Sequence, residues 1–190
     1  MAHGGLKDAL RQQLITARQA VTPEEWKEGD QRRTVHALDL LRQRRPGVLA
    51  IYASRGGEPG TRDIITGAVD AGWQVMLPVV TKHVAWAPFT GWENMAKGRL
   101  DIPHPTGTPL PAAVLARATM VITSCLAVSS EGVRLGTGRG WWDTALPHRR
   151  SGTAVWSLAR AVEVLDHIPT HPHDVAVNAV ITEAGFRPLA

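Results

Sequence analysis

The sequence contains very little cysteine. Cys125 is the only one in 190 residues, so the chain cannot form an internal disulfide or a zinc cluster built from several thiolates. Its place in an apolar segment predicts a small core residue. Because disulfides belong to oxidising compartments, the composition favours a protein of the reducing cytoplasm.

Long hydrophobic runs are also absent. The longest candidate, AAVLARATMVITSCLAV at 112–128, is interrupted by Arg117, whereas a membrane span needs about 18 to 20 apolar residues. The first residues, MAHGGLKDALRQQ, lack the apolar core of a secretory signal. We therefore expect neither a membrane partner nor export.

Concentrated positive charge is scarce. The formal net charge is +4, but the dense basic runs are short, namely RQRR at 42–45 and HRR at 148–150. Neither run lies beside a zinc-finger spacing or an aromatic RNA-binding motif, so we expect no nucleic-acid partner. The positive field suits an anionic small molecule instead.

The chain does contain a repeated alternation of strand-like and helical segments. With 44% hydrophobic residues it can bury one core, and we predict one domain, 1–190. The alternation predicts an α/β three-layer sandwich, in which helices cover both faces of a mainly parallel sheet. Helices are expected at 5–18, from Thr22 into the low forties, at 61–72, around 112–118 and from Trp141. Strands are expected at 47–53, 73–80, 84–89 near an edge, 120–126, 153–159 and, as the last element, 178–182.

Four glycines crowd the stretch SSEGVRLGTGRGWWDT at 129–144, directly after the strand expected at 120–126. Ligand sites in parallel sheets lie beyond the carboxyl ends of the strands. Glycines leave backbone N–H groups uncovered for phosphate oxygens, and Arg134 and Arg139 can donate forked hydrogen bonds to the same oxygens. Asp143 is then best explained as a magnesium ligand, because Mg²⁺ is commonly held by one or two carboxylates and substrate phosphates.

A basic stripe runs along the first predicted helix. Lys7, Arg11 and Arg18 fall within about 40° of one another when each residue advances by about 100°. Taken alone, the stripe is explained first as an ordinary solvated face, with a binding surface as the alternative.

The phrase GVRLGTGRGWWD resembles the signature of the 5-formyltetrahydrofolate cyclo-ligase family, also called methenyltetrahydrofolate synthetases, in which this run binds ATP and magnesium. Other blocks resemble the same family and occur in the family's order, and with the signature they span nearly the whole chain. They are KDALRQQLITAR, YASRGGEPGT, GRLDIPHPTG and HIPTHPHDVAVNAVITEAG.

The resemblance implies ATP-binding residues in the first helix and in the glycine stretch. They are Lys7, Arg11, Arg18, Arg134, Gly136, Gly138, Arg139, Gly140, Trp141 and Trp142. Within this set the resemblance makes Arg134 and Lys7 catalytic. It implies Asp143 and Asp174 as the ligands of Mg²⁺.

The reaction that the resemblance implies starts with transfer of the γ-phosphoryl group of ATP to the formyl oxygen of 5-formyltetrahydrofolate. The neighbouring amine then closes a ring, and 5,10-methenyltetrahydrofolate, ADP and phosphate are the products. Ala53, Glu58 and Trp142 are implied as folate-binding residues, and Trp92 is a further candidate neighbour of the pterin. Such chemistry needs mainly positioning and cations around the transferred group, and we expect a monomer acting on this small molecule.

Several positions depart from the family pattern. Val128 and Ser129 stand where Phe-Asp is common, Trp141 and Trp142 replace two tyrosines, and Glu163 replaces a usual glutamine. Because of these departures, two alternatives to the cyclo-ligase activity are kept. They are a relative that binds nucleotide or folate without this activity, and a kinase acting on another small molecule.

Overall fold

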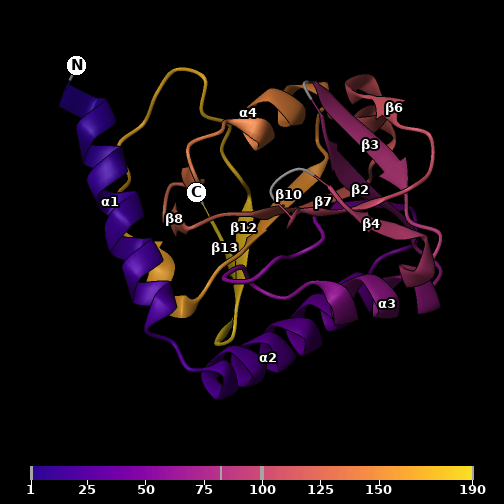
Figure 1. Cartoon of the computed structure of the whole chain (residues 1–190), viewed down its shortest axis with the longest axis horizontal. Helices are drawn as coiled ribbons and strands as arrows, with labels where there is room; N and C mark the ends of the chain where they lie inside the picture. The colour runs from indigo at the N-terminus through magenta and orange to yellow at the C-terminus, as the bar shows by residue number, and fades with distance from the viewer. Residues whose placement is uncertain (1, 82, 99–100, 190) are drawn as a thin grey trace.

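A twisted sheet forms the centre of the molecule (Figure 1). The structure is a computed structural model that describes residues 2–81, 83–98 and 101–189. Within these residues the largest sheet has eight strands in the order β13-β12-β10-β7-β1-β2-β3-β6. They are β1 (Val48–Ile51), β2 (Gln74–Val80), β3 (Val84–Pro88), β6 (Leu110–Pro111), β7 (Met120–Ser124), β10 (Ala154–Leu158), β12 (Ala179–Thr182) and β13 (Gly185–Pro188).

The sheet is mainly parallel, as predicted. Strands β12, β10, β7, β1 and β2 run parallel to their neighbours in this series, and β13, β3 and β6 are antiparallel additions at the edges. In the central pair, Leu49 lies beside Met120 and Ile51 beside Ile122. All of these side chains are fully buried, which explains why both strands are almost entirely apolar.

Helices cover both faces of this sheet (Figure 1). Helices α2 (Pro23–Arg42) and α3 (Arg62–Asp70) lie on one face, and the short α4 (Trp141–Ala145) lies on the other. Helix α2 begins with a capping box, in which the hydroxyl of Thr22 accepts the N–H of Glu25 and the carboxylate of Glu25 accepts the N–H of Thr22. In the described part of the chain, no helix combines the length and hydropathy needed to cross a membrane.

Helix α1 (Ala2–Gln19) packs on a second, smaller sheet rather than on the central one. The apolar stripe of α1 supplies Leu10 and Leu14, which contact a cluster containing Ala127, Leu135 and Ile168. The strands of this sheet are β8 (Ala127–Ser129), β9 (Arg134–Leu135) and β11 (Val164–Leu165). Because β9 leads into the glycine stretch, this packing brings the first helix to that stretch.

Short elements differ from the sequence prediction. The helix expected around 112–118 is a 3₁₀-helix, η3 (Ala112–Arg117). A second 3₁₀-helix, η4 (Leu146–His148), comes directly after α4. The strand expected as the last element is β12, but one more strand, β13, follows it and pairs with it. A hairpin of β4 (Met95–Lys97) and β5 (Pro103–Pro105) was not expected either. Strands this short carry too little periodicity to be predicted, because pairing with distant residues decides them.

Truncation of Ile122 tests the assigned core. This residue lies in β7 between β1 and β10, and Ile122→Ala leaves a cavity there, so the free energy of unfolding should fall by about 2 to 5 kcal/mol. The matched control is Val162→Ala, at a side chain that is 69% exposed, which should change it by less than about 0.5 kcal/mol. Urea denaturation monitored by circular dichroism measures the free energy of unfolding of both variants. Equal decreases in the two variants would contradict the placement of Ile122 in the core.

Candidate active site

A cavity lies where the strand order of the sheet changes direction. From β1 the chain continues to β2 on one side, whereas β7, β10 and β12 follow on the other side. Such a reversal leaves a crevice beyond the carboxyl ends of the two central strands. A cavity of about 1070 Å³ opens there, and its walls include Ala53 after β1 and Ser124 at the end of β7.

The glycine stretch forms one wall of this cavity. Gly136, Arg139 and Gly140 line it, between β9 and α4. A Cβ atom at Gly136 or Gly140 would meet no heavy atom within 4 Å, and one at Gly138 would find Arg11 3.6 Å away. The backbone therefore borders open space, as binding of phosphate oxygens to its N–H groups requires.

Gly132, at the start of the same stretch, serves the fold instead. Its φ is 79°, and a Cβ atom there would overlap the carbonyl oxygen of Val177. The carbonyl of Gly132 accepts the N–H of Val177 at 2.9 Å. Only glycine allows this close approach of two backbone segments.

Arg134 and Asp143 form an ion pair in the cavity wall. Nη2 of Arg134 donates to Oδ1 of Asp143 at 2.6 Å, and Nη1 donates to the carbonyl of Val175 at 3.2 Å. The Arg134 side chain is 2% exposed. Burial lowers its pKa and the charge of Asp143 opposes this shift, so the guanidinium keeps its charge.

Lys7 and Asp174 form a second pair, although 167 positions separate them. Nζ of Lys7 donates to Oδ2 of Asp174 at 2.6 Å, and the N–H of His171 donates to the same oxygen at 2.7 Å. Burial alone would raise the pKa of Asp174, but these hydrogen bonds and the charge of Lys7 hold it below its usual value. Each carboxylate predicted to bind metal thus lies against a cation predicted to be catalytic.

The basic stripe of the first helix faces the protein. Nε of Arg11 donates to the carbonyl of Gly136 at 3.0 Å, which joins α1 directly to the glycine stretch. The side chains of Lys7 and Arg18 are 5% exposed, and that of Arg11 is 20% exposed. The explanation of this stripe as a solvated face is therefore wrong, because each cation has an acceptor on a distant segment.

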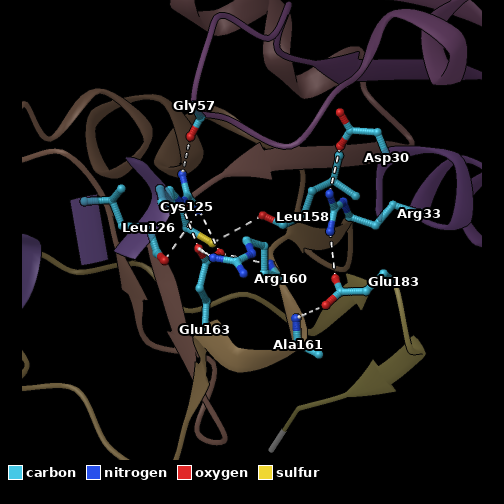
Figure 2. Close-up of polar contacts among 11 residues, drawn as sticks. Asp30, Arg33, Gly57, Cys125, Leu126, Leu158, Arg160, Ala161, Glu163 and Glu183 are labelled. Atoms are coloured by element: carbon cyan, nitrogen blue, oxygen red, sulfur yellow. Dashed lines mark hydrogen bonds and ion pairs between the residues drawn. The ribbon is translucent and has the colours of Figure 1, made fainter. Parts of the chain in front are cut away.

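Arg18 contacts a different set of acceptors from the other two cations. Its Nε and Nη2 donate to the two carboxylate oxygens of Glu163 at 2.7 and 2.8 Å. Figure 2 labels Glu163 and the further acceptors Gly57 and Cys125. Its Nη1 donates to the carbonyl of Gly57 at 3.0 Å, and Nη2 also donates to that of Cys125 at 2.8 Å. Burial alone would lower the pKa of Arg18, but Glu163 raises it. Sequence reasoning missed this partner, because no local pattern connects residues 145 positions apart.

Glu58 and Ala53 lie on the loop that follows β1, and both line the cavity. Oε2 of Glu58 accepts the N–H of Arg55 at 3.1 Å, and the N–H of Glu58 donates to the carbonyl of Arg55 at 3.1 Å. Burial raises the pKa of Glu58, and the interactions with Arg55 oppose that shift only in part. A carboxylate held in this way can accept hydrogen bonds from N–H groups of a bound ring.

Tryptophans form an aromatic wall beside the glycine stretch. The ring centroids of Trp86 and Trp141 are 5.2 Å apart, and those of Trp141 and Trp142 are 5.0 Å apart. Nε1 of Trp142 donates to the hydroxyl of Ser124 at 3.1 Å. Trp141 and Trp142 both line the cavity, so their flat surfaces are available to a bound ring.

Trp92 is not among the residues that line the cavity in the described part of the chain, and its place beside a pterin stays a prediction. Its Nε1 donates to the hydroxyl of Thr66 on α3 at 3.0 Å. The guanidinium of Arg62 lies over its ring, 4.2 Å from the centroid. These contacts hold the indole against the outer helix instead of the cavity.

Comparison with known proteins decides the family. The model of the 5-formyltetrahydrofolate cyclo-ligase family matches residues 4–183. A Mycolicibacterium smegmatis protein named 5-formyltetrahydrofolate cyclo-ligase is 33% identical over 182 residues, which cover 93% of each chain. The chain belongs to the 5-formyltetrahydrofolate cyclo-ligase family. It is therefore an enzyme of the ligase class.

Solved structures share the fold of this cyclo-ligase family member. The NMR structure of Aquifex aeolicus 5,10-methenyltetrahydrofolate synthetase is similar with a TM-score of 0.79 and 20% identity, over 97% of this chain and 93% of that chain. The corresponding synthetase of Mycoplasma pneumoniae gives a TM-score of 0.75 and 16% identity, over 93% of this chain and 98% of that chain. The central sheet and its helices are thus those of the family.

Carboxylates are the groups of the site that could hold a metal ion. Mg²⁺ in such sites needs one or two carboxylates, and phosphates and waters complete its shell. Asp143 lines the cavity beside the open glycine backbone. The described residues contain no group of three or more His, Cys, Asp or Glu that could hold a metal ion. This donor set fits Mg²⁺ carried by phosphates better than a metal held by protein groups alone.

The raised pKa of Glu58 makes the folded enzyme less stable once this carboxyl ionises. In the unfolded chain the pKa returns to its ordinary 4.5, so between the two values the folded state holds more protons and stability falls as pH rises. Glu58→Gln, which keeps an acceptor for the N–H of Arg55, should stabilise the protein at about pH 7 but not below about pH 4. Urea denaturation at both pH values measures this, and a gain independent of pH would contradict it.

Proposed function

We propose that this enzyme catalyses the ATP- and Mg²⁺-dependent cyclisation of 5-formyltetrahydrofolate to 5,10-methenyltetrahydrofolate, with release of ADP and phosphate. The observation that carries the proposal is one cavity in which an open glycine backbone with Arg134 and the loop carrying Ala53 and Glu58 form walls. Its volume of about 1070 Å³ slightly exceeds the range of about 300 to 1,000 Å³ for ligand pockets, which supports room for two reactants.

The chemistry explains why ATP is needed. A formyl amide is a poor electrophile, and its oxygen is a poor leaving group. Transfer of the γ-phosphoryl group to that oxygen releases ADP and converts the oxygen into a phosphate ester. The lone pair of the neighbouring amine then forms a bond to the formyl carbon, the amine loses its proton, and the carbon–oxygen bond breaks as phosphate leaves.

The chain's own residues supply cations and donors for this transfer. The N–H groups around Gly136 and Gly140 border open space and would bind phosphate oxygens, with Arg139 beside them. Arg134 and Lys7 would stabilise negative charge that develops on the transferred group. Gly138 and Arg11 complete this side, because Arg11 holds the carbonyl of Gly136. Mg²⁺, held by Asp143 and Asp174, would neutralise further charge on the phosphates.

The folate side is formed by Ala53, Glu58 and the Trp142 ring. Ala53 is small and leaves room for a flat ring at the end of β1. The carboxylate of Glu58 would accept hydrogen bonds from the N–H groups on the ring edge, and the indole of Trp142 would cover part of its face. We further propose that the enzyme acts as a cytoplasmic monomer, because the reaction as written needs no residue from a second chain.

Gly136→Ala tests the phosphate-binding wall. Gly136 is not among the positive-φ residues, and its Cβ would enter open space, so the fold should tolerate alanine. The methyl group would stand where phosphate oxygens bind, and loss of one hydrogen bond to a charged group, about 1.5 to 3 kcal/mol, should weaken ATP binding by about tenfold or more. Calorimetric titration with ATP and Mg²⁺ measures this. Gly107→Ala, also in open space, is the control, and equal effects would refute the assignment.

Arg134→Ala and Asp143→Asn test the catalytic assignment. Arg134→Ala removes a fixed cation beside the transferred group, and Asp143→Asn removes the carboxylate proposed to hold Mg²⁺. Each should lower kcat by about 10²- to 10³-fold, as removal of comparable electrostatic contacts does. The assay follows absorbance of the methenyl product with ATP and Mg²⁺ near neutral pH, and circular dichroism checks folding. The exposed Arg150→Ala should leave kcat unchanged. ATP consumption without methenyl product would favour a kinase for another substrate, and binding without turnover would favour a non-catalytic relative.

A further inference from the structure

Arg18, which lines the cavity, forms a buried pair with Glu163. The side chains are 5% and 2% exposed, and the carboxylate takes both of its strongest hydrogen bonds from one guanidinium. Glu163 ends the 3₁₀-helix η5 (Ala161–Glu163), and its Oε2 also accepts the N–H of Arg160 at 2.9 Å. Forked geometry with burial on both sides fixes the guanidinium in one orientation.

That orientation joins segments that carry the folate side of the cavity. Nη1 of Arg18 donates to the carbonyl of Gly57, the residue before Glu58. Nη2 donates to the carbonyl of Cys125, directly after β7. One guanidinium therefore ties the loop after β1, the end of β7 and η5 together.

The other end of the same loop is held by Asp30, which pairs with a second buried arginine. The N–H of Gly60 donates to Oδ1 of Asp30 at 2.8 Å. Nη2 of Arg33 donates to the same oxygen at 2.8 Å, a contact drawn in Figure 2. Nη1 of Arg33 donates to Glu183 at 2.7 Å, and Glu183 accepts the N–H of Ala161 at 2.9 Å. Both anchors of the loop thus lead back to η5.

These contacts distinguish Arg18 from a phosphate ligand. Pairing alone does not decide this, because Lys7 and Arg134 are also paired, but their carboxylate partners are 13% and 21% exposed whereas Glu163 is 2% exposed. All three nitrogens of the Arg18 guanidinium already donate within the protein, to Glu163 and to backbone carbonyls. Breaking them to bind ATP would leave a buried carboxylate without its partner, which costs about 3 to 5 kcal/mol in comparable pairs.

We propose that Arg18 and Glu163 are positioning residues for the folate substrate, which act by holding the loop that carries Glu58, and that Arg18 does not bind the phosphates of ATP. This inference rests on the proposed function. It changes the role that the family resemblance implies for Arg18. It also gives Glu163, a departure from the family pattern, a task in this chain.

The test uses the double variant Arg18→Met/Glu163→Leu, because removal of both charges avoids a lone buried ion. The expected result is a rise of about 10- to 100-fold in KM for 5-formyltetrahydrofolate, since the misplaced loop binds its substrate poorly. KM for ATP should change by less than about twofold. A rise in KM for ATP with unchanged KM for folate would overturn the proposal, and so would unchanged values of both.

Two further variants separate positioning from general damage. Glu163→Gln keeps an oxygen for Nε of Arg18 but removes the charge that pairs with it. KM for folate should therefore rise less than in the double variant, because the guanidinium keeps part of its anchor. Arg32→Met removes an arginine from an exposed pair with Glu28, whose side chains are 61% and 64% exposed, and should change neither KM. Loss of folate affinity in this control would also overturn the proposal.

A readout without catalysis keeps the two proposals apart. Hydrogen exchange at the amides of Glu58 and Gly60 should quicken by about tenfold or more in the ligand-free double variant, because their loop loses an anchor. Unchanged exchange would overturn the positioning role even if the enzyme is active. An inactive wild-type enzyme whose loop is loosened in the variant would instead refute the proposed function and leave the anchoring role supported.

Discussion

The parallel pairing of β1 with β7 is the interaction on which the site depends. These strands are neighbours in the sheet although about 70 positions separate them, and their apolar side chains are buried on both faces. Because the chain leaves β1 toward one side and continues from β7 toward the other, the loops after the two strands diverge and a cavity opens between them. The glycine stretch and the Glu58 loop can then border the same space.

Two ion pairs and a hydrogen bond to a backbone carbonyl complete this arrangement by fastening α1 to three other segments. Lys7 contacts Asp174 in the terminal segment, Arg11 contacts Gly136 in the glycine stretch, and Arg18 is paired with Glu163. A buried charge is tolerated only with a well-placed partner, so such pairs specify geometry more than they add stability. One helix thereby sets the relative positions of three segments that are remote in sequence.

Pairing also balances charges within the protein, because Arg134 lies against Asp143 and Lys7 against Asp174. In the proposed reaction, a triphosphate with its metal would bring partners of the opposite sign for both members of each pair. The cations would bind the phosphates and the carboxylates would bind the metal, which explains why both charges occur together in a site for a polyanion.

Local patterns predicted the larger elements well. Thr22 marked the start of α2, and apolar runs marked β1, β7 and β10, because capping and burial act on residues close together in the chain. The same reasoning failed for β13 and for the 3₁₀ character of η3, which depend on neighbours elsewhere in the fold. It also could not tell which way Trp92 faces, since an aromatic in a glycine-containing loop can face either a cavity or a helix.

The sequence by itself determined the class of fold, the glycine stretch and the family, since these follow from residue types and spacings that are local. Only the tertiary structure decided which carboxylate meets which cation and that Arg18 faces Glu163 rather than the glycine stretch. Pairs separated by 145 and 167 positions have no spacing that a sequence pattern can read. Their distances are set by how α1 packs on the small sheet, and that packing is a property of the whole fold.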